Sequence, residues 1–265
     1  MNNNILLEKH KAVWLITINR PDKMNSLDLD DNEELVEIWR SFDLDPEARV
    51  AVVTGAGTEA FCAGADLKTY TRQYATTPAP EFRRKYTNGP GFGGITRGMD
   101  IYKPTLAAVN GYAISGGFEL ALACDIRFAT PNAEFALQDS KWGFHACDGG
   151  LIRLPQIVGL GHAMEIILSG NRVDCETGYR MGLVNRIVPQ EDLVASAMDY
   201  ASMLATRSPL SHQFAKEVLK RTVGLSMDEA LKLESRSFYD VGQTDDLSEG
   251  TTAFREKRQA RFQGN

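Results

Sequence analysis

Hydrophobic and polar positions in the first half of the chain alternate between strand-like and helix-like spacing. The runs 12–18 (AVWLITI) and 49–54 (RVAVVT) are rich in β-branched residues, so each predicts a strand. Between them, residues 28–42 carry hydrophobic side chains at helical spacing. A strand, a helix and a strand are predicted again at 105–109, 118–123 and 126–129. Such units have parallel strands joined by a right-handed crossover, so the pattern predicts an α/β fold.

After about residue 190 the spacing becomes helical throughout. Three stretches follow one another with no predicted strand between them: 193–204, 209–221 and 227–239. Ser226 and Glu229 form a capping box at the start of the third stretch. We therefore predict an α/β core over residues 1–190 and a helical C-terminal subdomain over residues 191–265.

Residues 70–100 form an irregular insert within the predicted core. Prolines and glycines interrupt any regular spacing at Pro78, Pro80, Gly89, Pro90, Gly91, Gly93 and Gly94. A long insert of this kind in a compact core is typical of a lid that covers a pocket.

The composition is that of a globular protein with a sizeable core. The chain has 265 residues, of which 43% are hydrophobic and 24% charged. Lys and Arg number 29 against 35 Asp and Glu, and the resulting charge of −6 disfavours binding to a phosphate backbone. The apolar run 13–16 near the start is far too short to span a bilayer. We expect no nucleic-acid partner and no membrane partner.

The cysteines and the ends of the chain favour a cytoplasmic protein. Four cysteines lie far apart without a CxxC pair, a spacing typical of reduced thiols: Cys62, Cys124, Cys147 and Cys175. The start, MNNNILLEKH, lacks the basic and apolar regions of a secretory signal. The end, FQGN, is not a peroxisomal tripeptide.

Two glycine-containing turns are candidates for binding through the main chain. They are 61–67 (FCAGADL) and 110–119 (NGYAISGGFE), and the second joins a predicted strand to a predicted helix. Small residues let main-chain N–H groups approach a ligand atom, and the N–H groups at a helix start are unpaired and carry partial positive charge. Two such donors aimed at one point would form an oxyanion hole for a thioester enolate. Tight packing of helix on sheet is the alternative explanation.

Glu119 adds a carboxylate to the second turn. It lies three residues after Gly116 on the same face of the first helical turn, so its side chain and the Gly116 amide can point into one pocket. An acid at this place can also serve only to complement the helix dipole. The surrounding sequence GGFELALA indicates a buried helix, however, and a buried acid favours a chemical role.

Asp139 is the second candidate acid. After Glu119 the chain reverses near residues 124–125, returns as the strand 126–129 and runs out again over 134–137. This path can bring Asp139 back to the edge where Glu119 lies. Two carboxylates facing one cavity can share a water molecule, one as base and the other as acid, although the spacing alone also allows a structural acid.

At these residues the sequence resembles the crotonase superfamily, the enoyl-CoA hydratase/isomerase family. The likeness covers nearly the whole chain, in NRPDKMNSL at 19–27, FCAGADL at 61–67, KPTLAAVNGYAISGGFELALACDIRFA at 103–129, RLPQIVG at 153–159, GLVNRIVP at 182–189 and SEGTTAFREKRQARF at 248–262. The resemblance implies a spiral of repeated ββα units followed by a helical C-terminal trimerisation subdomain. It also implies a homotrimer or homohexamer.

The resemblance implies roles for particular residues. The oxyanion donors correspond to the amides of Ala65 and Gly116, and the catalytic acids to Glu119 and Asp139. Residues expected to contact the substrate are Ala63, Asp66, Leu67, Lys68, Gly117, Phe144, His145, Asp148 and Lys257. Of these, Lys68 and Lys257 match positions near the CoA phosphates, the latter often supplied by a neighbouring subunit; solvated surface charges are the alternative. Coenzyme A belongs to the substrate, so no separate cofactor and no metal are expected.

The chain also departs from the family pattern. Hydratases of this type usually show Pro-Glu where this chain has Gln138-Asp139, so the second acid is one methylene shorter. The stretch 141–150 (KWGFHACDGG) replaces a smaller, more aliphatic pattern, and Phe144 and His145 within it could narrow or polarise the acyl pocket. Relatives that isomerise double bonds, displace halide or hydrolyse thioesters place an aspartate one position before Asp148. The insert carries aromatics that suggest a cyclic or aromatic acyl group: Tyr70, Tyr74, Phe82, Tyr86 and Phe92.

The resemblance predicts an enoyl-CoA hydratase-type lyase, with enoyl-CoA isomerase or acyl-CoA hydrolase as alternatives. A distant alternative is a serine hydrolase, because Ala113-Ile114-Ser115-Gly116-Gly117 is similar to a nucleophile elbow. Its base would be His145, His162 or His212.

A dinucleotide-binding protein, a non-catalytic binding protein and a metalloprotein fit the sequence less well. The segment 55–60 (GAGTEA) fits a dinucleotide fingerprint, but Gly64 breaks the helix that should follow. A non-catalytic CoA- or RNA-binding relative conflicts with the intact Glu119 and with the acidic charge. His145, Cys147 and Asp148 could suggest a metal, but three ligands on one short turn without a fourth are better explained as polar loop residues.

Overall fold

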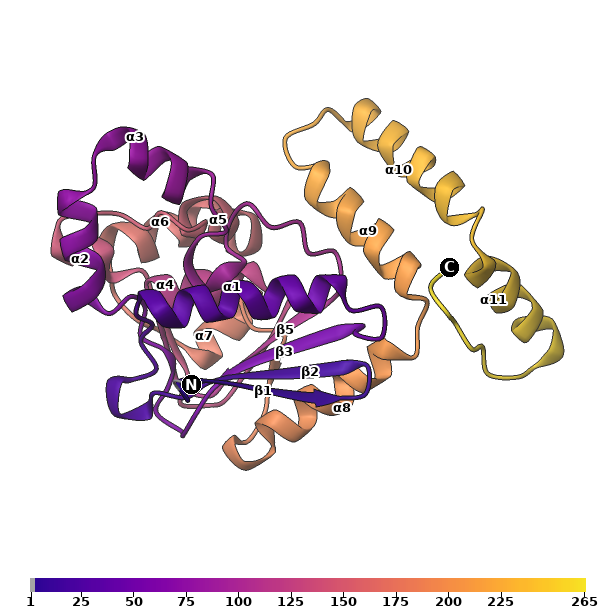
Figure 1. The fold of residues 1–265 in the computed structure, drawn as a ribbon, viewed down its shortest axis with the longest axis horizontal. Coiled ribbons are helices and arrows are strands. Elements are labelled where there is room, and N and C mark those ends of the chain that lie inside the picture. Colours follow the sequence, from indigo (N-terminus) through magenta and orange to yellow (C-terminus); the bar gives the residue numbers. More distant parts are fainter. Residues whose placement is uncertain (1–2) are drawn as a thin grey trace.

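The computed structural model describes residues 3–265, apart from the side chains of residues 71, 72, 74 and 85. The aromatic ring predicted at Tyr74 therefore lies outside the described residues. Figure 1 shows a layered core of strands and helices, and an arm of helices that extends from it towards the C-terminus.

The larger sheet forms the base of the core. Within residues 3–265 it has six strands in the order β1-β2-β3-β5-β7-β10. These strands are β1 (Ile5–His10), β2 (Val13–Ile18), β3 (Val50–Gly55), β5 (Thr105–Val109), β7 (Ile126–Ala129) and β10 (Arg186–Ile187). β1 pairs antiparallel with β2, and the other neighbours pair parallel. The strands predicted within 12–18, 49–54, 105–109 and 126–129 are confirmed.

A smaller sheet lies where the site is built. In the described part of the chain it has four strands in the order β4-β6-β8-β9. They are β4 (Ala60–Cys62), β6 (Tyr112–Ile114), β8 (Glu134–Ala136) and β9 (Val173–Asp174). The chain passes repeatedly from the larger sheet to the smaller one and then into a helix: β3-β4-α2, β5-β6-α4 and β7-β8-α5. This repetition is the predicted crotonase-like spiral of ββα units.

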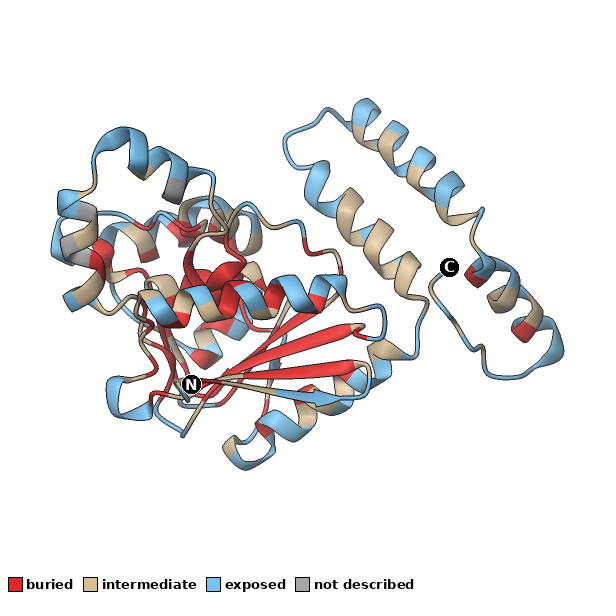
Figure 2. Ribbon diagram, viewed as in Figure 1, coloured by how far each residue is buried: buried red, intermediate tan, exposed pale blue. Residues whose placement is uncertain are grey.

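Helices cover the sheets. α1 (Leu29–Leu44) begins at the capping box of Asp28 and Asp31, and its Trp39 indole donates to the Gly93 carbonyl at 2.8 Å. The other helices of the core are α2 (Leu67–Thr76), α3 (Ala79–Phe82), α4 (Gly116–Ala123), α5 (Gly150–Val158), α6 (Leu160–Ser169) and α7 (Cys175–Arg180). The buried residues concentrate in the strands and in α4 (Figure 2).

The prediction of an irregular insert over 70–100 is partly wrong. The helix α2 runs to Thr76, and α3 and the π-helical turn Arg83–Thr87 follow it. The Asp66 side chain caps α2 by accepting from the Lys68 amide at 3.1 Å. Local capping therefore outweighs the weak hydrophobic spacing of this segment, and the irregular part begins at about residue 88.

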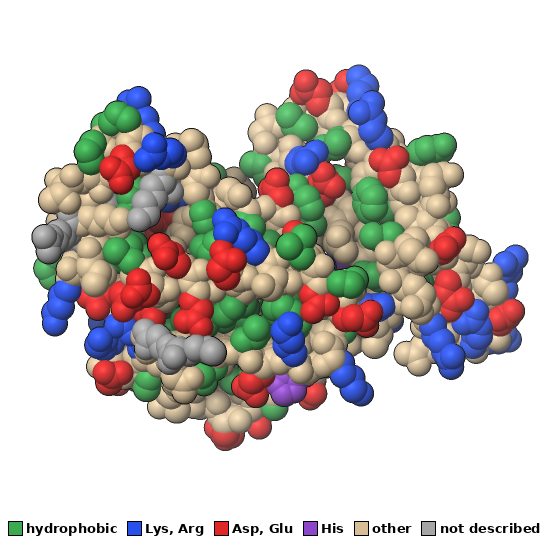
Figure 3. Space-filling model, viewed as in Figure 1, with side chains coloured by type: hydrophobic (Ala, Val, Ile, Leu, Met, Phe, Trp, Pro, Cys, Tyr) green, Lys and Arg blue, Asp and Glu red, His purple; other side chains and the backbone are tan. Residues whose placement is uncertain are grey.

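The C-terminal segment has two parts. α8 (Leu193–Ala205) packs on the larger sheet, with Leu193, Ala197 and Ala201 in one hydrophobic cluster with Val50 and Leu106. The arm consists of α9 (Pro209–Arg221), α10 (Met227–Val241) and α11 (Asp245–Glu256), and large hydrophobic side chains lie on its surface (Figure 3). The capping box at Ser226 and Glu229 is confirmed. The boundary at residue 190 and the role in trimerisation stay predictions.

Within residues 3–265, no helix combines the length and the hydrophobicity that crossing a bilayer requires.

Candidate functional site

The two glycine-containing turns lie against each other. β4 and β6 run side by side, with Cys62 opposite Ala113, and both strands lead directly into the turns. Gly64 has a φ of +94°, and a Cβ atom placed on it would lie 3.3 Å from the Gly116 nitrogen. Only a glycine allows this approach, because it has no Cβ and accepts a positive φ.

The two amides predicted as oxyanion donors have no hydrogen-bond acceptor within the described residues 3–265. Gly116 is the first residue of α4, so its N–H has no partner within the helix. Ala65 bridges to Leu27, but the bonds of that bridge use the Gly64 carbonyl and the Asp66 amide. In the described part of the chain, neither the Ala65 nor the Gly116 nitrogen donates to a protein acceptor. Both therefore can bind a ligand oxygen near the positive end of α4.

Ser115 holds the turn into α4 in a strained conformation. Its φ of 47° and ψ of −117° are unusual for a residue other than glycine. Its amide donates to the Ala136 carbonyl at 2.8 Å, and its carbonyl accepts from the Glu119 amide at 2.9 Å. Ser115 thus joins β8 to the first turn of α4.

Glu119 is buried at the start of α4, with 2% of its surface exposed. Its Oε1 accepts from the Asp148 amide at 2.7 Å and from the Gly150 amide at 2.8 Å. Burial raises the pKa of the Glu119 carboxyl from 4.5 to about 8, the Asp148 charge adds to this rise, and the two amides oppose it. A carboxyl with a pKa near neutrality can both accept and donate a proton.

Asp139 lies in the 3₁₀ helix Gln138–Trp142 and is also buried, with 6% exposed. Among the described residues, its Oδ2 atom has no hydrogen-bond partner. Burial raises the pKa of the Asp139 carboxyl, while the Ser115 hydroxyl and His145 lower it. Its charge also contributes to the raised pKa of Glu119, so the fold brings the two predicted acids into one electrostatic environment.

Asp148 does not present a free carboxylate. Its Oδ1 accepts from the Phe92 amide at 3.0 Å and the Thr96 hydroxyl at 2.9 Å. The same oxygen lies 3.1 Å from Arg97 Nε in an ion pair. Sequence reasoning missed Thr96 and Arg97, because the glycines and proline before them predict a turn but not its direction.

Other residues expected near the substrate have various surroundings. Phe144, His145 and Leu67 are exposed, and the Ala63 amide donates to the Met24 carbonyl. Asp66 caps α2. A Cβ on Gly117 would lie 1.9 Å from the Cys62 carbonyl oxygen. Tight packing, the alternative explanation for these glycines, therefore applies to Gly117.

Lys68 and Lys257 lie far apart in one chain. Lys68 is in α2 on the core, whereas Lys257 follows α11 at the outer end of the arm (Figure 1). Both side chains are exposed. One chain alone does not bring them to a common CoA site.

A pocket of about 390 Å³ is lined in part by the buried residue Asp148. It lies between α1, α2 and residues 86–97, and its lining includes Tyr70, Tyr86, Phe92, Arg97 and Asp148. The Phe92 ring also lies against Gly116, since a Cβ there would be 3.1 Å from the ring. Glu119 is not among the lining residues, but its Oε1 accepts a hydrogen bond from the amide of Asp148, which lines the pocket.

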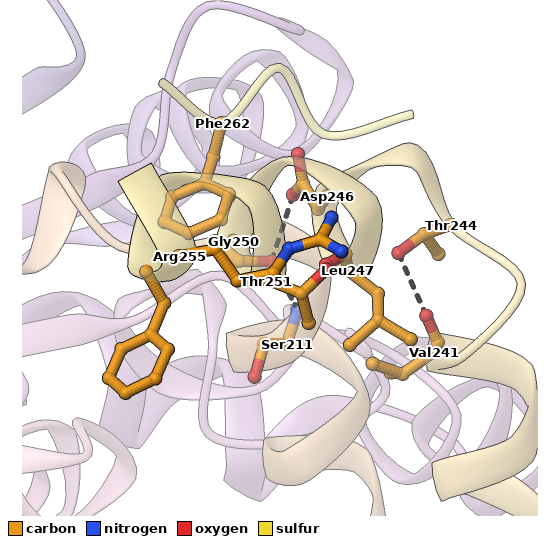
Figure 4. A pocket seen from close by; sticks show the side chains of 11 residues that line it. Ser211, Val241, Thr244, Asp246, Leu247, Gly250, Thr251, Arg255 and Phe262 are labelled. Carbon is orange, nitrogen blue, oxygen red and sulfur yellow. Dashed lines mark hydrogen bonds between the residues drawn. The ribbon is translucent and has the colours of Figure 1, made fainter. Parts of the chain in front are cut away.

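A second pocket, of about 520 Å³, lies in the arm. Figure 4 shows Phe262, Arg255 and Leu247 around it, with the Thr244 hydroxyl bonded to the Val241 carbonyl. It is formed by α9, the end of α10, α11 and the C-terminal tail, far from α4 (Figure 1). No cluster of potential metal ligands is present among the described residues, His145, Cys147 and Asp148 included.

Comparisons with known proteins agree with this arrangement. A family model described as "Enoyl-CoA hydratase/isomerase" matches residues 8–265. Carnitinyl-CoA dehydratases of Citrobacter koseri and Escherichia coli K12 are each 37% identical over 269 residues, covering 100% of both chains. The crystal structure of an enoyl-CoA hydratase from Bacillus anthracis has a TM-score of 0.88 at 33% identity, covering 99% of this chain and 100% of that chain.

An enoyl-CoA hydratase from Mycobacterium tuberculosis has a TM-score of 0.89 at 32% identity, covering 99% of both chains. The similarity in sequence and the similarity in structure therefore both extend over nearly the whole chain. The chain belongs to the enoyl-CoA hydratase/isomerase family of enzymes, in the crotonase superfamily.

Proposed function

We propose that the protein is a hydratase-type lyase that adds water across the α,β double bond of an acyl-CoA thioester, or removes it. The observation that carries this proposal is the pair of unused amides of Ala65 and Gly116 beside a buried Glu119. The relatives named dehydratases support the same bond chemistry in the reverse direction.

In the proposed reaction the thioester carbonyl oxygen accepts hydrogen bonds from the Ala65 and Gly116 amides. Negative charge builds on this oxygen as water attacks Cβ, and the two donors stabilise it. One such donor is typically worth roughly 3–4 kcal/mol of barrier. The donors are fixed by the β4–β6 pairing and by the start of α4, so little reorganisation accompanies the reaction.

Glu119 and Asp139 would divide the proton transfers. Glu119, held by two amides, orients the water and takes its proton. Asp139 donates a proton to Cα during hydration and accepts it during dehydration. The side chain of Asp139 is one methylene shorter than a glutamate, and this motivates the alternative reaction, isomerisation. If it does not reach Cα, Glu119 acts alone and the enzyme shifts a double bond instead of hydrating it. Hydrolysis of the thioester is the further alternative within the family.

The acyl group is proposed to enter the 390 Å³ pocket. Its aromatic lining of Tyr70, Tyr86 and Phe92 suits a cyclic or aromatic acyl group. The same rings suit a quaternary ammonium, which aromatic faces bind through cation–π attraction. Because the relatives are named carnitinyl-CoA dehydratases, carnitinyl-CoA is the first substrate to test.

We also propose that the enzyme acts in the cytoplasm as a homotrimer or homohexamer. Assembly would let Lys257 of one subunit reach the CoA phosphates bound near Lys68 of another. The separation of these two lysines within one chain supports this arrangement.

Incubation with a panel of acyl-CoA esters in heavy-oxygen water tests the function. The panel contains straight-chain, aromatic and trimethylammonium-bearing enoyl esters, and mass spectrometry identifies the products. Heavy oxygen at C3 is the expected result. A shifted double bond without added oxygen would identify an isomerase instead, and free CoA would identify a hydrolase.

A serine hydrolase is the other candidate that a specific observation favours. The strained strand-to-helix turn at Ser115 is the backbone shape of a nucleophile elbow. However, the Ser115 hydroxyl is bonded to the Asp139 carboxyl, which is not the histidine base that such a hydrolase uses. Labelling of Ser115 by a fluorophosphonate would support this candidate, and an unlabelled serine is expected.

A further inference from the structure

Asp148 contacts two parts of the molecule through two different groups. Its carboxylate binds the segment 91–97, through the Phe92 amide, the Thr96 hydroxyl and the Arg97 guanidinium. Its main-chain amide donates to Glu119 at 2.7 Å. One residue therefore connects the wall of the acyl pocket with the buried acid.

The surrounding bonds fix Asp148 in this place. Arg153 donates to the Asp148 carbonyl at 3.1 Å and to the Thr96 carbonyl at 2.7 Å. A Cβ on Gly91 would lie 2.6 Å from Asp148 Oδ1, so the segment comes as close as a glycine permits. The Asp148 carboxylate is 7% exposed and the Arg97 side chain 27% exposed, so solvent screens their ion pair only partly.

The charges that face Glu119 come from several elements. Asp139 from the 3₁₀ helix and Asp148 from the loop before α5 are like charges, and both raise the pKa of Glu119. Arg153 from α5 is the opposing charge: burial lowers the pKa of its guanidinium, and the negative charges of Glu119 and Asp148 oppose that fall. Cys147 is exposed as a residue, but desolvation of its thiol and the nearby Asp148 charge raise its pKa to about 12, so it is neutral near pH 7. Arg97 from the 91–97 segment acts on this set through its ion pair with Asp148.

We propose that Asp148 is a positioning residue that couples the acyl pocket to Glu119. Its carboxylate fastens the 91–97 segment, its amide holds Glu119 Oε1, and the Arg97 partner sets how strongly its charge acts on Glu119. In this proposal the aspartate acts through Glu119 and not as a nucleophile or an acid itself. Both Arg97 and Asp148 line the pocket, so an acyl group that contacts this pair changes the proton affinity of Glu119 when it binds. The catalytic part of this inference rests on the proposed function, in which Glu119 is the base.

Two substitutions with opposite expected signs test the coupling. Asp148→Asn keeps an oxygen for the Phe92 amide and the Thr96 hydroxyl but removes the negative charge, so the pKa of Glu119 should fall by about one unit. Arg97→Gln removes the partner and leaves the Asp148 charge uncompensated, so the pKa of Glu119 should rise. Arg97→Lys keeps the positive charge and should restore the parent value.

The readout is the infrared carbonyl band of protonated Glu119, defined as the band that Glu119→Gln lacks and followed against pH without substrate. The pH dependence of kcat/KM on the best enoyl-CoA should shift in the same direction as the band. Midpoints that stay at the parent value, or move the same way in both variants, overturn the proposal. If Asp148→Asn does not fold, the other two variants test the proposal: the pKa of Glu119 should rise in Arg97→Gln and return to the parent value in Arg97→Lys. Shifted bands with turnover that does not need Glu119 would refute the proposed function but leave the coupling intact.

Discussion

Glu119 shows how burial and hydrogen bonding oppose each other at one residue. Removal from water favours the neutral carboxyl, whereas the Asp148 and Gly150 amides favour the carboxylate. Burial and the Asp148 charge prevail, and the pKa is raised to about 8. Near neutral pH, Glu119 can therefore be present in both its protonated and its ionised form, as acid–base chemistry on a thioester requires.

The raised pKa predicts a pH-dependent penalty on stability. The ordinary carboxyl pKa is 4.5 and the folded value is about 8, so between these values the folded state binds more protons than the unfolded state. The free energy of unfolding contributed by Glu119 therefore falls as pH rises through this range and is lowest above about pH 8. Glu119→Gln removes the penalty, so its advantage over the parent should grow from pH 5 to pH 8 by on the order of a few kcal/mol. Urea unfolding of both proteins across this range measures it, and a difference that does not vary with pH would contradict the raised pKa.

At the scale of elements, the sequence indicated the long elements better than the short ones. The β-branched run of β2 and the helical spacing of α9 were sufficient to predict both. β4 and β6 are each three residues long, so no periodicity could identify them. α11 was also missed, because its hydrophobic residues Leu247 and Phe254 are exposed and do not form a buried stripe.

In the candidate site, too, some residues could be predicted from the local sequence and others could not. Glu119 and Gly116 are close in sequence, so a local argument brings them together. The contacts of Asp148 depend on the fold of residues 91–97, which no local pattern determines. Lys257 lies at the end of the arm, so its role depends on another subunit and stays a prediction.

The packing of α4 on β4 is expected to depend on Gly117. A Cβ there would lie 1.9 Å from the Cys62 carbonyl oxygen, so Gly117→Ala should push α4 away and destabilise the protein by at least about 2 kcal/mol. Hydration activity should fall with it, because α4 carries the Gly116 amide. Gly161→Ala in α6 is the matched control, because a Cβ there would meet none of the described atoms within 4 Å. This variant should be neutral or stabilising. Urea unfolding compares the two, and equal stability of both variants would refute this dependence on Gly117.

At the scale of the whole molecule, the arm leaves large hydrophobic side chains exposed to solvent. Phe238 in α10 is 78% exposed and Phe254 in α11 is 85% exposed. Figure 2 shows the arm as mostly exposed or half-buried, in contrast to the sheets. Exposed apolar surface of this extent is typical of a protein interface, so the arm is the part of the chain where we expect subunits to meet.

Replacing both Phe238 and Phe254 with lysine should therefore weaken the association of subunits. We expect Phe238→Lys/Phe254→Lys to shift the mass in solution from a trimer or hexamer towards a monomer, because burying two charges in an interface is costly. Sedimentation velocity measures this shift. Glu47→Lys, an exposed position outside the arm, is the control and should leave the mass unchanged. A parent protein that is already monomeric, or a variant that assembles normally, would contradict the predicted interface.

The role of Glu119 as the base is tested by the turnover of Glu119→Gln on the enoyl-CoA that the parent hydrates best. We predict that kcat falls at least about a hundredfold, with little change in KM, because the amides of Ala65 and Gly116 remain to bind the thioester. Parent-like incorporation of heavy oxygen at C3 by this variant would show that water reaches the acyl chain without Glu119, and would contradict the mechanism.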